Sequence, residues 1–438
     1  MVPKSPPKLT VVLTLTIGIK CFPMRCFDFH CQGESHKATD KVCQDYSYSH
    51  IDENGLAVAV VCDGHGGKRY FRSNVGARFA SEIIANNVKE FVGNINESLL
   101  IGQPFTQQAA IQTEIDRQDF RKEKPIDIAF RQLFGSIIGQ WQQRIEQHAA
   151  DNPLTDKEKE QVEEQYKNEF LSGYKLEKIY GCTLMAYVST PRYWFAFHLG
   201  DGKLISFDKD AQWNEPVLWD DRCLLNKTTS ICDSDALNEF RYTYQGDGGF
   251  PVAVFLGSDG MDDSFGEETN LVNFYVRVAK SLVKEGFEAT FADIKETLPV
   301  LSKRGSQDDM SIACVYDEKA LEEALPKFIL WQIAITKAGI LKVNNKILEA
   351  TDRRNELEEK VLTLEKDKIA LRYAQNDIDR AYIEKQQLVK KMNVLLEEYH
   401  GKDYVPYQDE VGEQPKERQQ VWRMDDHPFR VHLVWVEL

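Results

Sequence analysis

The chain has 438 residues, 42% of them hydrophobic, which suits one large domain with appendages or two to three domains. Its formal net charge of −15 argues against general binding to nucleic acid or to anionic membranes, because both need a positively charged surface. Nine cysteines without a disulfide-like spacing are typical of a reducing compartment, so we expect a cytoplasmic protein.

The first 23 residues look like an extension in front of the folded chain. Lys4 and Lys8 precede an apolar run over residues 9–19, as in a weak signal peptide. The run is too short to span a membrane, and no small-residue cleavage site follows it. Because Met24 stands immediately before the first strand-like segment, we expect residues 1–23 to be a leader or a non-native extension.

A hairpin is expected early in the chain. Residues 46–51 and 56–62 are strand-like and flank Asn54-Gly55, a pair typical of tight turns between strands. The hairpin would bring Asp45, at the start of one strand, close to Asp63, at the end of the other.

The central motif follows the second strand of this hairpin. An apolar, β-branched run over residues 58–62 indicates a buried strand, and it ends at Asp63-Gly-His-Gly-Gly67. The glycines let the backbone turn sharply and approach something small. A carboxylate at the end of a rigid strand is a ligand that hard divalent cations prefer.

The other strands are expected at 25–32, 181–188, 193–199, 204–207, 251–256 and 310–316. The helices are expected at 71–88, 126–149, 155–170, 270–286 and 288–302. Residues 209–250 are loop-rich and are expected to form a flap-like insert on the surface. Strands that end in aspartate and alternate with paired helices indicate a layered α/β fold.

The C-terminal part differs in kind. Apolar residues recur in steps of three and four over residues 340–396, which predicts one long helix with an imperfect heptad seam. Two interpretations stay open: a coiled-coil arm for a partner protein or for self-association, and a helix packed on its own domain. We expect a body over 24–318, a helical arm over 319–400, and a tail over 401–438 that serves as an extra strand or a docking segment.

Aspartates gather at the ends of the predicted strands. Asp63, Asp201, Asp259 and Asp308 each adjoin a buried run, and Asp45 lies beside the hairpin. One aspartate at a strand end is ordinary, since this residue favours turns. Several carboxylates at one sheet edge would repel one another unless cations lay between them. The pattern therefore predicts a site for divalent cations.

Single members of this set have simpler interpretations. His65 and Asp201 could be turn residues without a chemical role. Three further aspartates are expected to face solvent or to support the ligands, with Asp263 favoured for support: Asp262, Asp263 and Asp309.

Five motifs follow one another along the chain: Asp63-Gly-His-Gly-Gly, Gly181-Cys-Thr, Gly200-Asp-Gly, Ser258-Asp-Gly-Met-Asp-Asp and Gly305-Ser-Gln-Asp-Asp-Met-Ser. In this order they resemble the metal-dependent type-2C protein serine/threonine phosphatases, and the loop over residues 33–45 is similar to their bacterial-type branch. The resemblance covers residues 33–316. It implies a four-layer α-β-β-α sandwich with two central antiparallel sheets, to which this chain adds its long C-terminal helix. It also implies hydrolysis of phosphoserine and phosphothreonine on proteins.

The resemblance implies two Mn²⁺ or Mg²⁺ ions and assigns their ligands. Asp63 would bridge both ions and so act in catalysis, and the carbonyl of Gly64 would bind the second. Asp259 and Asp308 would hold the first, and Asp45 would bind a metal directly or through water. Two such ions activate a shared water and neutralise the phosphoryl oxygens during attack.

Two more roles come with the resemblance. His65 would be the general acid that protonates the leaving alkoxide. Asp201, together with Asp259, could hold a third and weaker metal ion.

Two positions depart from the family pattern. Gln44 stands where many members have an acidic residue, and Asp40 stands where many have a phosphate-binding arginine. Loss of a guanidinium would weaken phosphate binding. Four nearby cations could replace it: Lys37, Lys41, Lys68 and Arg69.

These departures leave a second hypothesis open. The chain could be a catalytically silent scaffold with a phosphatase fold that binds phosphoproteins and partners through its C-terminal helix. The complete set of aspartates favours the enzyme, whereas Gln44 and Asp40 favour the scaffold.

Overall fold

The computed structural model describes residues 24–108, 124–162, 164–167, 175–223, 227–359 and 365–408. The expectations for residues 1–23 and for residues 409–438 of the tail lie outside these ranges.

Two antiparallel sheets form the centre of the molecule. One has the order β1 (Met24–Cys31), β11 (Met310–Asp317), β10 (Ala253–Gly257), β7 (Lys203–Phe207) and β8 (Trp213–Asn214). The other has the order β2 (Tyr46–Ile51), β3 (Ala57–Cys62), β5 (Leu184–Ser189), β6 (Trp194–Leu199), β9 (Arg241–Gln245) and β4 (Thr106–Gln108).

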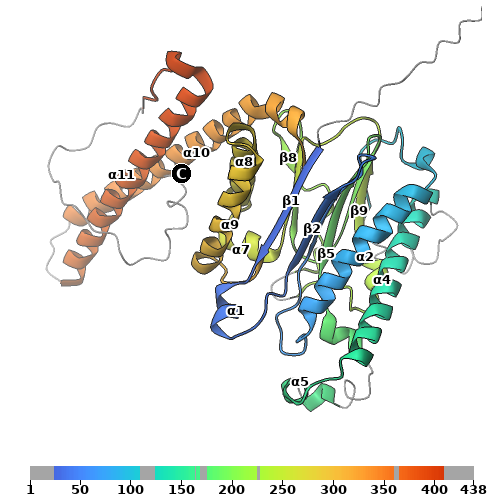
Figure 1. The fold of residues 1–438 in the computed structure, drawn as a ribbon. Helices are drawn as coiled ribbons and strands as arrows, with labels where there is room; N and C mark the ends of the chain where they lie inside the picture. Colours follow the sequence, from blue (N-terminus) through green and yellow to red (C-terminus); the bar gives the residue numbers. More distant parts are fainter. Residues whose placement is uncertain are drawn as a thin grey trace, which may run out of the picture.

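Helices cover the outer face of each sheet (Figure 1). The six-stranded sheet is covered by α2 (Ser73–Asn94) and α4 (Pro125–Asp151), and the five-stranded sheet by α8 (Glu268–Lys284) and α9 (Phe287–Arg304). The predicted four-layer α-β-β-α sandwich is therefore confirmed.

Shorter helical segments connect these elements. The short α-helices are α1 (Glu34–Ala38), α5 (Asp156–Gln161) and α7 (Asp259–Phe265). The 3-10 turns are η1 (Glu97–Leu99), η3 (Glu164–Tyr166), η4 (Leu176–Tyr180), η5 (Ala236–Asn238) and η6 (Gly401–Asp403). The helix predicted over 155–170 is wrong in length, because α5 ends at Gln161 and Val162 is extended.

Strand β3 explains why its sequence is a continuous apolar run. Successive side chains of a strand point to opposite faces of the sheet. Val58 and Val60 contribute to the core under α2 and α4, whereas Ala59 and Val61 contribute to the core between the two sheets. Because both faces are buried, the strand reads as uniformly apolar, and its end is held rigidly.

The flap predicted over residues 209–250 is wrong for its second half. Strand β9 belongs to the six-stranded sheet, between β6 and β4. Aromatic side chains around it join the core: the rings of Phe134 and Phe240 stack with centroids 4.2 Å apart, and those of Phe130 and Tyr242 lie 4.6 Å apart. Polar residues alternate with these aromatic residues in the sequence, so the pattern did not indicate a buried strand.

The C-terminal region consists of two helices, α10 (Glu318–Glu358) and α11 (Glu365–His400). The long C-terminal helix is confirmed by α10, but one continuous helix over 340–396 is wrong. Lys346 pairs with Glu384 at 3.5 Å and Gly339 lies against Leu388, so the two helices run antiparallel. The heptad-like positions thus pack within one chain.

Both helices are attached to the sandwich through α8 (Figure 1). The Nζ atom of Lys280 donates to Oε1 of Gln332 on α10 at 2.7 Å and to Oε2 of Glu398 on α11 at 2.8 Å. This supports the interpretation in which the predicted helix packs on its own domain.

Within the described residues, α10 alone reaches the length and apolar content of a membrane span, with a window of mean hydropathy 1.3. One third of that window is buried inside the molecule. Core helices of soluble proteins meet the same criterion, so the expectation that the chain does not bind membranes stays a prediction.

Candidate active site

The strand register brings the predicted aspartates to one edge of the sandwich. Tyr46 pairs with Cys62, so Asp45 and Asp63 stand side by side at the same end of the hairpin, as predicted. Gly257 pairs with Ile312, which places Asp259 after β10 close to Asp308 before β11.

A small cavity of about 90 Å³ lies at this edge. It is lined by Asp63, Gly64, His65, Gly66, Thr183, Asp201, Thr228, Asp259, Asp308 and Asp309. A water molecule takes up about 30 Å³ in the liquid, so the space suits a few waters or ions rather than an organic ligand. Every predicted ligand except Asp45 lines it.

Asp45 lies beside the cavity and is 4% exposed. One of its carboxylate oxygens accepts a hydrogen bond from the Ser311 hydroxyl at 2.8 Å. Burial and the carboxylate of Asp309 raise the pKa of Asp45 to about 7. Asp45 therefore lies close enough to Asp309 and Asp259 for their charges to interact.

The cavity concentrates negative charge. Burial and the neighbouring Asp259 raise the pKa of Asp63 well above its usual value. The same two causes raise the pKa of Asp201 to about 6 and also raise the pKa of Asp308. Carboxylates that hinder one another's ionisation are stabilised when a cation joins them.

The segment directly after β10, where no helix was predicted, forms the helix α7. Asp259 occupies the first turn of α7, where the helix dipole favours a negative charge. A side chain at Gly260 would meet the backbone oxygen of Asp309 at 2.1 Å, so only glycine lets α7 approach the Asp308 loop.

Asp309 is not solvated, as had been one expectation, but 3% exposed. Its two oxygens accept backbone hydrogen bonds from Gly33 at 2.6 Å and Gln44 at 2.5 Å, and Nδ1 of His36 lies 2.9 Å from one of them. With Asp308, the two side chains form a group whose ligand atoms could hold a metal. The two N–H bonds and the imidazole already satisfy Asp309, so we assign it to holding the loop over residues 33–45.

Gln44 replaces an acidic residue of the family pattern with an amide that holds the central loop. Its Nε2 atom donates to the carbonyl of His65 at 3.0 Å and to the Ser73 hydroxyl at 2.5 Å. An amide can donate where a carboxylate cannot, so Gln44 connects the hairpin to the loop after Asp63.

The His65 side chain is fixed at the rim of the cavity. Its Nε2 atom lies 2.7 Å from the Ser230 hydroxyl, and its ring meets the Tyr70 ring edge-on with centroids 4.6 Å apart. Burial lowers the pKa of His65 to about 4, so the imidazole is neutral at pH 7.

Sequence reasoning missed several residues around the cavity. Thr183 and Thr228 line it, and Ser230 orients His65. Thr183 lies within the Gly181-Cys-Thr motif, which was a usable signal. Nothing in the sequence near Thr228 or Ser230 marks these residues, because only the path of the chain brings them to the site.

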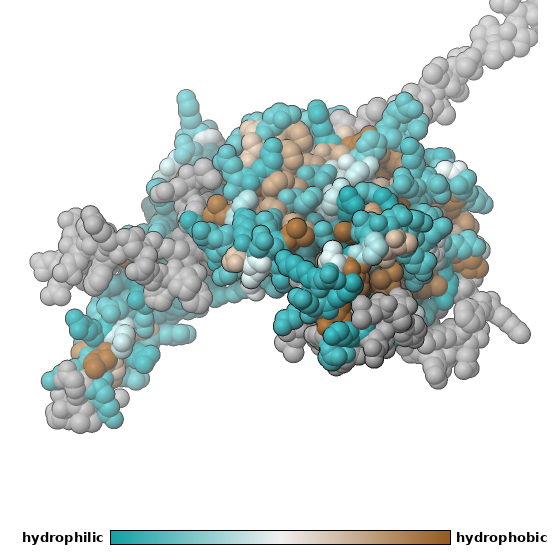
Figure 2. All heavy atoms as spheres, turned by 60° about the horizontal axis from the view of Figure 1, so that its bottom comes forward, coloured by the Kyte–Doolittle hydropathy of each residue, from teal (hydrophilic) through white to brown (hydrophobic). Residues whose placement is uncertain are grey.

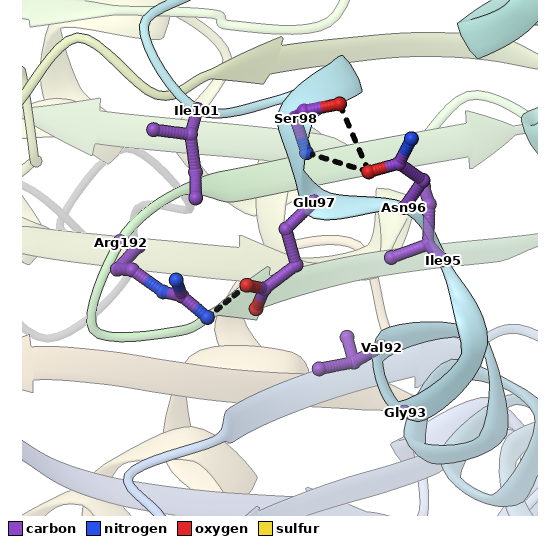
Figure 3. A pocket seen from close by; sticks show the side chains of 8 residues that line it. All are labelled: Val92, Gly93, Ile95, Asn96, Glu97, Ser98, Ile101 and Arg192. Carbon is purple, nitrogen blue, oxygen red and sulfur yellow. Dashed lines mark hydrogen bonds and ion pairs between the residues drawn. The ribbon is translucent and has the colours of Figure 1, made fainter.

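A second hollow, of about 610 Å³, lies at the end of α2 (Figure 3). It is open and its one carboxylate, from Glu97, is paired with Arg192. It holds no group of carboxylates, so it does not compete with the acidic cavity as the centre of metal chemistry.

Comparison with known proteins adds a family. A family model described as protein phosphatase 2C matches residues 32–298. No curated protein sequence matches the chain.

Solved structures with a similar fold include a bacterial serine phosphatase, with 13% sequence identity, a TM-score of 0.39 and coverage of 67% of this chain and 98% of that one. The serine/threonine phosphatase Stp1 from Staphylococcus aureus has 14% identity, a TM-score of 0.38 and coverage of 67% and 94%. A Caenorhabditis elegans sex determining protein has 11% identity, a TM-score of 0.41 and coverage of 69% and 67%.

Proposed function

Since the chain belongs to the protein phosphatase 2C family and is a protein serine/threonine phosphatase, we propose that it hydrolyses its phosphoester with water activated between two Mn²⁺ or Mg²⁺ ions. One observation carries this proposal: five aspartates from four separate parts of the chain line one small cavity.

The donor atoms fit such ions. The cavity offers carboxylate oxygens and the backbone of Gly64, and Mg²⁺ and Mn²⁺ prefer all-oxygen ligands with several waters retained. Burial and repulsion by the Asp259 carboxylate raise the pKa of Asp63 and of Asp201, and a bound cation would favour the ionised form of both. When bound, the ions would supply an activated water and neutralise charge on the phosphoryl oxygens.

We assign the predicted ligands on this basis. Asp63 would bridge the two ions, Asp259 and Asp308 would hold the first, and the Gly64 carbonyl would hold the second. The backbone oxygen of Asp63 accepts from the amide of Thr183 at 2.8 Å, which fixes the strand end.

Two further aspartates would bind metal ions beside the two-ion site. Asp45, oriented by Ser311, would bind a metal directly or through water. Asp201 with Asp259 would hold a third, weaker ion, since both line the same cavity.

His65 would deliver a proton to the leaving alkoxide. The ring lies at the cavity rim, where Ser230 fixes its orientation. A phosphate dianion beside the imidazole would raise its pKa from about 4 and favour the protonated form that an acid needs.

Lys41 is our choice for the cation that replaces the missing arginine. Its Nζ atom donates to the carbonyl of Gly66 at 3.2 Å, and Gly66 lines the cavity. An ammonium there lies at the edge of the cavity and would attract the phosphoryl oxygens of a substrate bound in it. Lys binds phosphate as a point charge rather than as a bidentate fork, so we expect weaker phosphate binding than an arginine gives.

The α10–α11 pair would bind a partner protein or a second copy of the chain. Several apolar side chains on it are exposed: Leu341, Leu348, Ile369, Tyr373 and Ile383. The acidic composition and scattered cysteines support a cytoplasmic location.

Hydrolysis of a small aryl phosphate tests the function. We expect activity that needs Mn²⁺ or Mg²⁺, stops on addition of a chelator, and is lost in Asp259→Asn. Glu267→Gln is the control, because this carboxylate lies just after helix α7 but is exposed and does not line the cavity.

Two outcomes would contradict the proposal. Activity that survives both the chelator and Asp259→Asn would exclude the metal mechanism. A folded wild-type protein that binds phosphopeptides but hydrolyses neither them nor the aryl phosphate would favour the silent scaffold.

A further inference from the structure

The side chain of Arg69 has a fixed position just after the central loop. Its guanidinium carbon lies 4.6 Å from the centroid of the Tyr70 ring and 5.9 Å from that of Tyr166. Its Nη2 atom also donates to the Tyr70 hydroxyl. Stacking of a guanidinium on aromatic rings limits its rotation, so the charge is held in one place.

Arg69 forms no ion pair within the described part of the chain, although the protein carries a net charge of −15. Its neighbours behave differently. Lys178 is paired with Asp233 at 2.7 Å, and Arg72 is paired with Glu158 at 2.6 Å. Aromatic rings rather than a carboxylate hold this cation, so its charge remains available to an incoming anion.

The position relative to the cavity limits what that anion can be. The Tyr70 ring contacts both the Arg69 guanidinium and the His65 ring, and its centroid lies 4.6 Å from each of them. His65 lines the cavity, whereas Arg69 does not. The guanidinium therefore lies outside the place of the phosphoryl group but close to it.

We propose that Arg69, held against Tyr70, is a binding subsite for an acidic group on the substrate polypeptide, either a carboxylate or a second phosphate, near the phosphorylated residue. An extended peptide rises by about 3.3 Å per residue, so a side chain two or three positions away would reach the guanidinium. A guanidinium matches carboxylate and phosphate with paired hydrogen bonds. The subsite rests on the proposed function and selects acidic phosphopeptides as the substrate class.

The test compares three substrates of the full-length enzyme with Mn²⁺: a phosphothreonine peptide with acidic flanks, the same peptide with neutral flanks, and a small aryl phosphate. The wild type should prefer the acidic peptide. Arg69→Met should reduce this preference about tenfold, the effect expected on losing a charged hydrogen bond, through a higher KM at unchanged kcat. Arg69→Lys keeps the charge and should keep part of the preference.

A matched control, Arg78, lies on α2, nine residues after Arg69 in the chain. Arg78 also stacks on a ring, that of Phe79 at 5.2 Å, but does not adjoin the cavity. Arg78→Met should leave the kcat and KM for all three substrates unchanged. Arg69→Met should also leave unchanged the rate of aryl phosphate hydrolysis and the Mn²⁺ concentration that gives half of the full activity.

The failures are distinguishable. If the wild type hydrolyses all three substrates and Arg69→Met retains the full preference, the subsite is wrong and the proposed function stands. If Arg69→Met slows all three substrates equally, Arg69 supports the fold and the subsite is also wrong. If the wild type hydrolyses none of them, the proposed function fails and the subsite fails with it.

Discussion

Two groups of buried charges lie close to each other in this molecule and differ in design. The cavity gathers like charges from Asp63, Asp201 and Asp259, and no cation of the described chain is among its lining residues. A few residues further on, Arg72 is surrounded by partners of the opposite kind and is 6% exposed.

The Arg72 group satisfies every polar atom of its guanidinium. The Nε and Nη2 atoms donate to the carboxylate of Glu158 at 2.6 and 2.9 Å, and Nη1 donates to the Asn152 carbonyl at 2.8 Å and the Tyr180 hydroxyl at 3.0 Å. Removal of one member of such a group leaves an unpaired buried charge.

The difference separates function from stability. A group with all partners present stabilises the fold, whereas a group of repelling carboxylates stabilises it only when a cation is added from outside. On the face shown in Figure 2 hydrophilic side chains predominate and the hydrophobic ones are scattered among them. The cavity carboxylates, which lack partners of opposite charge among the cavity residues, are therefore a stronger sign of a functional site than the Arg72 group or these hydrophobic side chains.

The largest effect is expected on removing a charge from the cavity. Asp63→Asn should reduce hydrolysis of an aryl phosphate by about 10³-fold or more, because two ions would lose their shared ligand. The same change should raise the unfolding temperature of the metal-free protein, because it removes repulsion. Activity assays and thermal unfolding in chelator measure both, and a lower metal-free unfolding temperature would contradict the comparison.

The opposite result is expected at Arg72. Arg72→Met should lower the free energy of unfolding by about 3–5 kcal/mol, because Glu158 and the backbone carbonyls of Asn152 and Pro153 lose their donor. The kcat of the folded protein should not change. Urea denaturation measures the loss. Arg144→Met removes a half-exposed pair with Glu82 and should cost less than about 1 kcal/mol, and an equal loss in both variants would remove the contrast.

The smallest effect is the dependence of stability on pH, which should have opposite signs in the two groups. Asp45 and Asp201 have folded-state pKa values raised to about 7 and 6, so the metal-free protein should gain stability as the pH falls from 7 towards 4. Saturating Mn²⁺ should abolish this gain. Thermal unfolding between pH 7 and 5 with and without metal measures it, and a gain that Mn²⁺ leaves unchanged would contradict the cation site.

Glu158 should act the other way at lower pH. Burial alone would raise its pKa, but hydrogen bonds from Arg72 and Thr155 lower it to about 2. Its contribution is therefore complete above about pH 4.5 and is lost as the pH falls towards 2. Glu158→Gln should flatten the stability curve in that range, and an unchanged curve would show that the pair contributes little.

Local patterns predicted most of the fold. The Asn54-Gly55 turn placed the hairpin, and the apolar runs placed the strands of both sheets, because turn chemistry and burial are written into a few neighbouring residues. The convergence of the aspartates was predictable for a related reason: each stands at a strand end, and antiparallel register brings alternate strand ends to the same edge.

The sequence was misleading where long-range packing decides. Strand β9 was predicted as part of a flap because its inner face is buried by α4, which lies far away in the chain. Residues 340–396 were predicted as one helix, although they belong to two helices that pack against each other. A heptad pattern does not reveal whether a helix packs on another chain or on a second helix of the same chain.

What the sequence determined by itself is therefore the chemistry available: strands that end in carboxylates, a histidine among glycines, and an excess of negative charge. Only the tertiary structure decided which groups meet. It brought Asp309 to the backbone of Gln44 and the Ser230 hydroxyl to the ring of His65. It also placed Arg69 beside the cavity, with aromatic rings and no ion pair among the described residues. The reason is physical: propensity and periodicity act between near neighbours, whereas these contacts join segments that only the packing of two sheets brings within hydrogen-bonding distance.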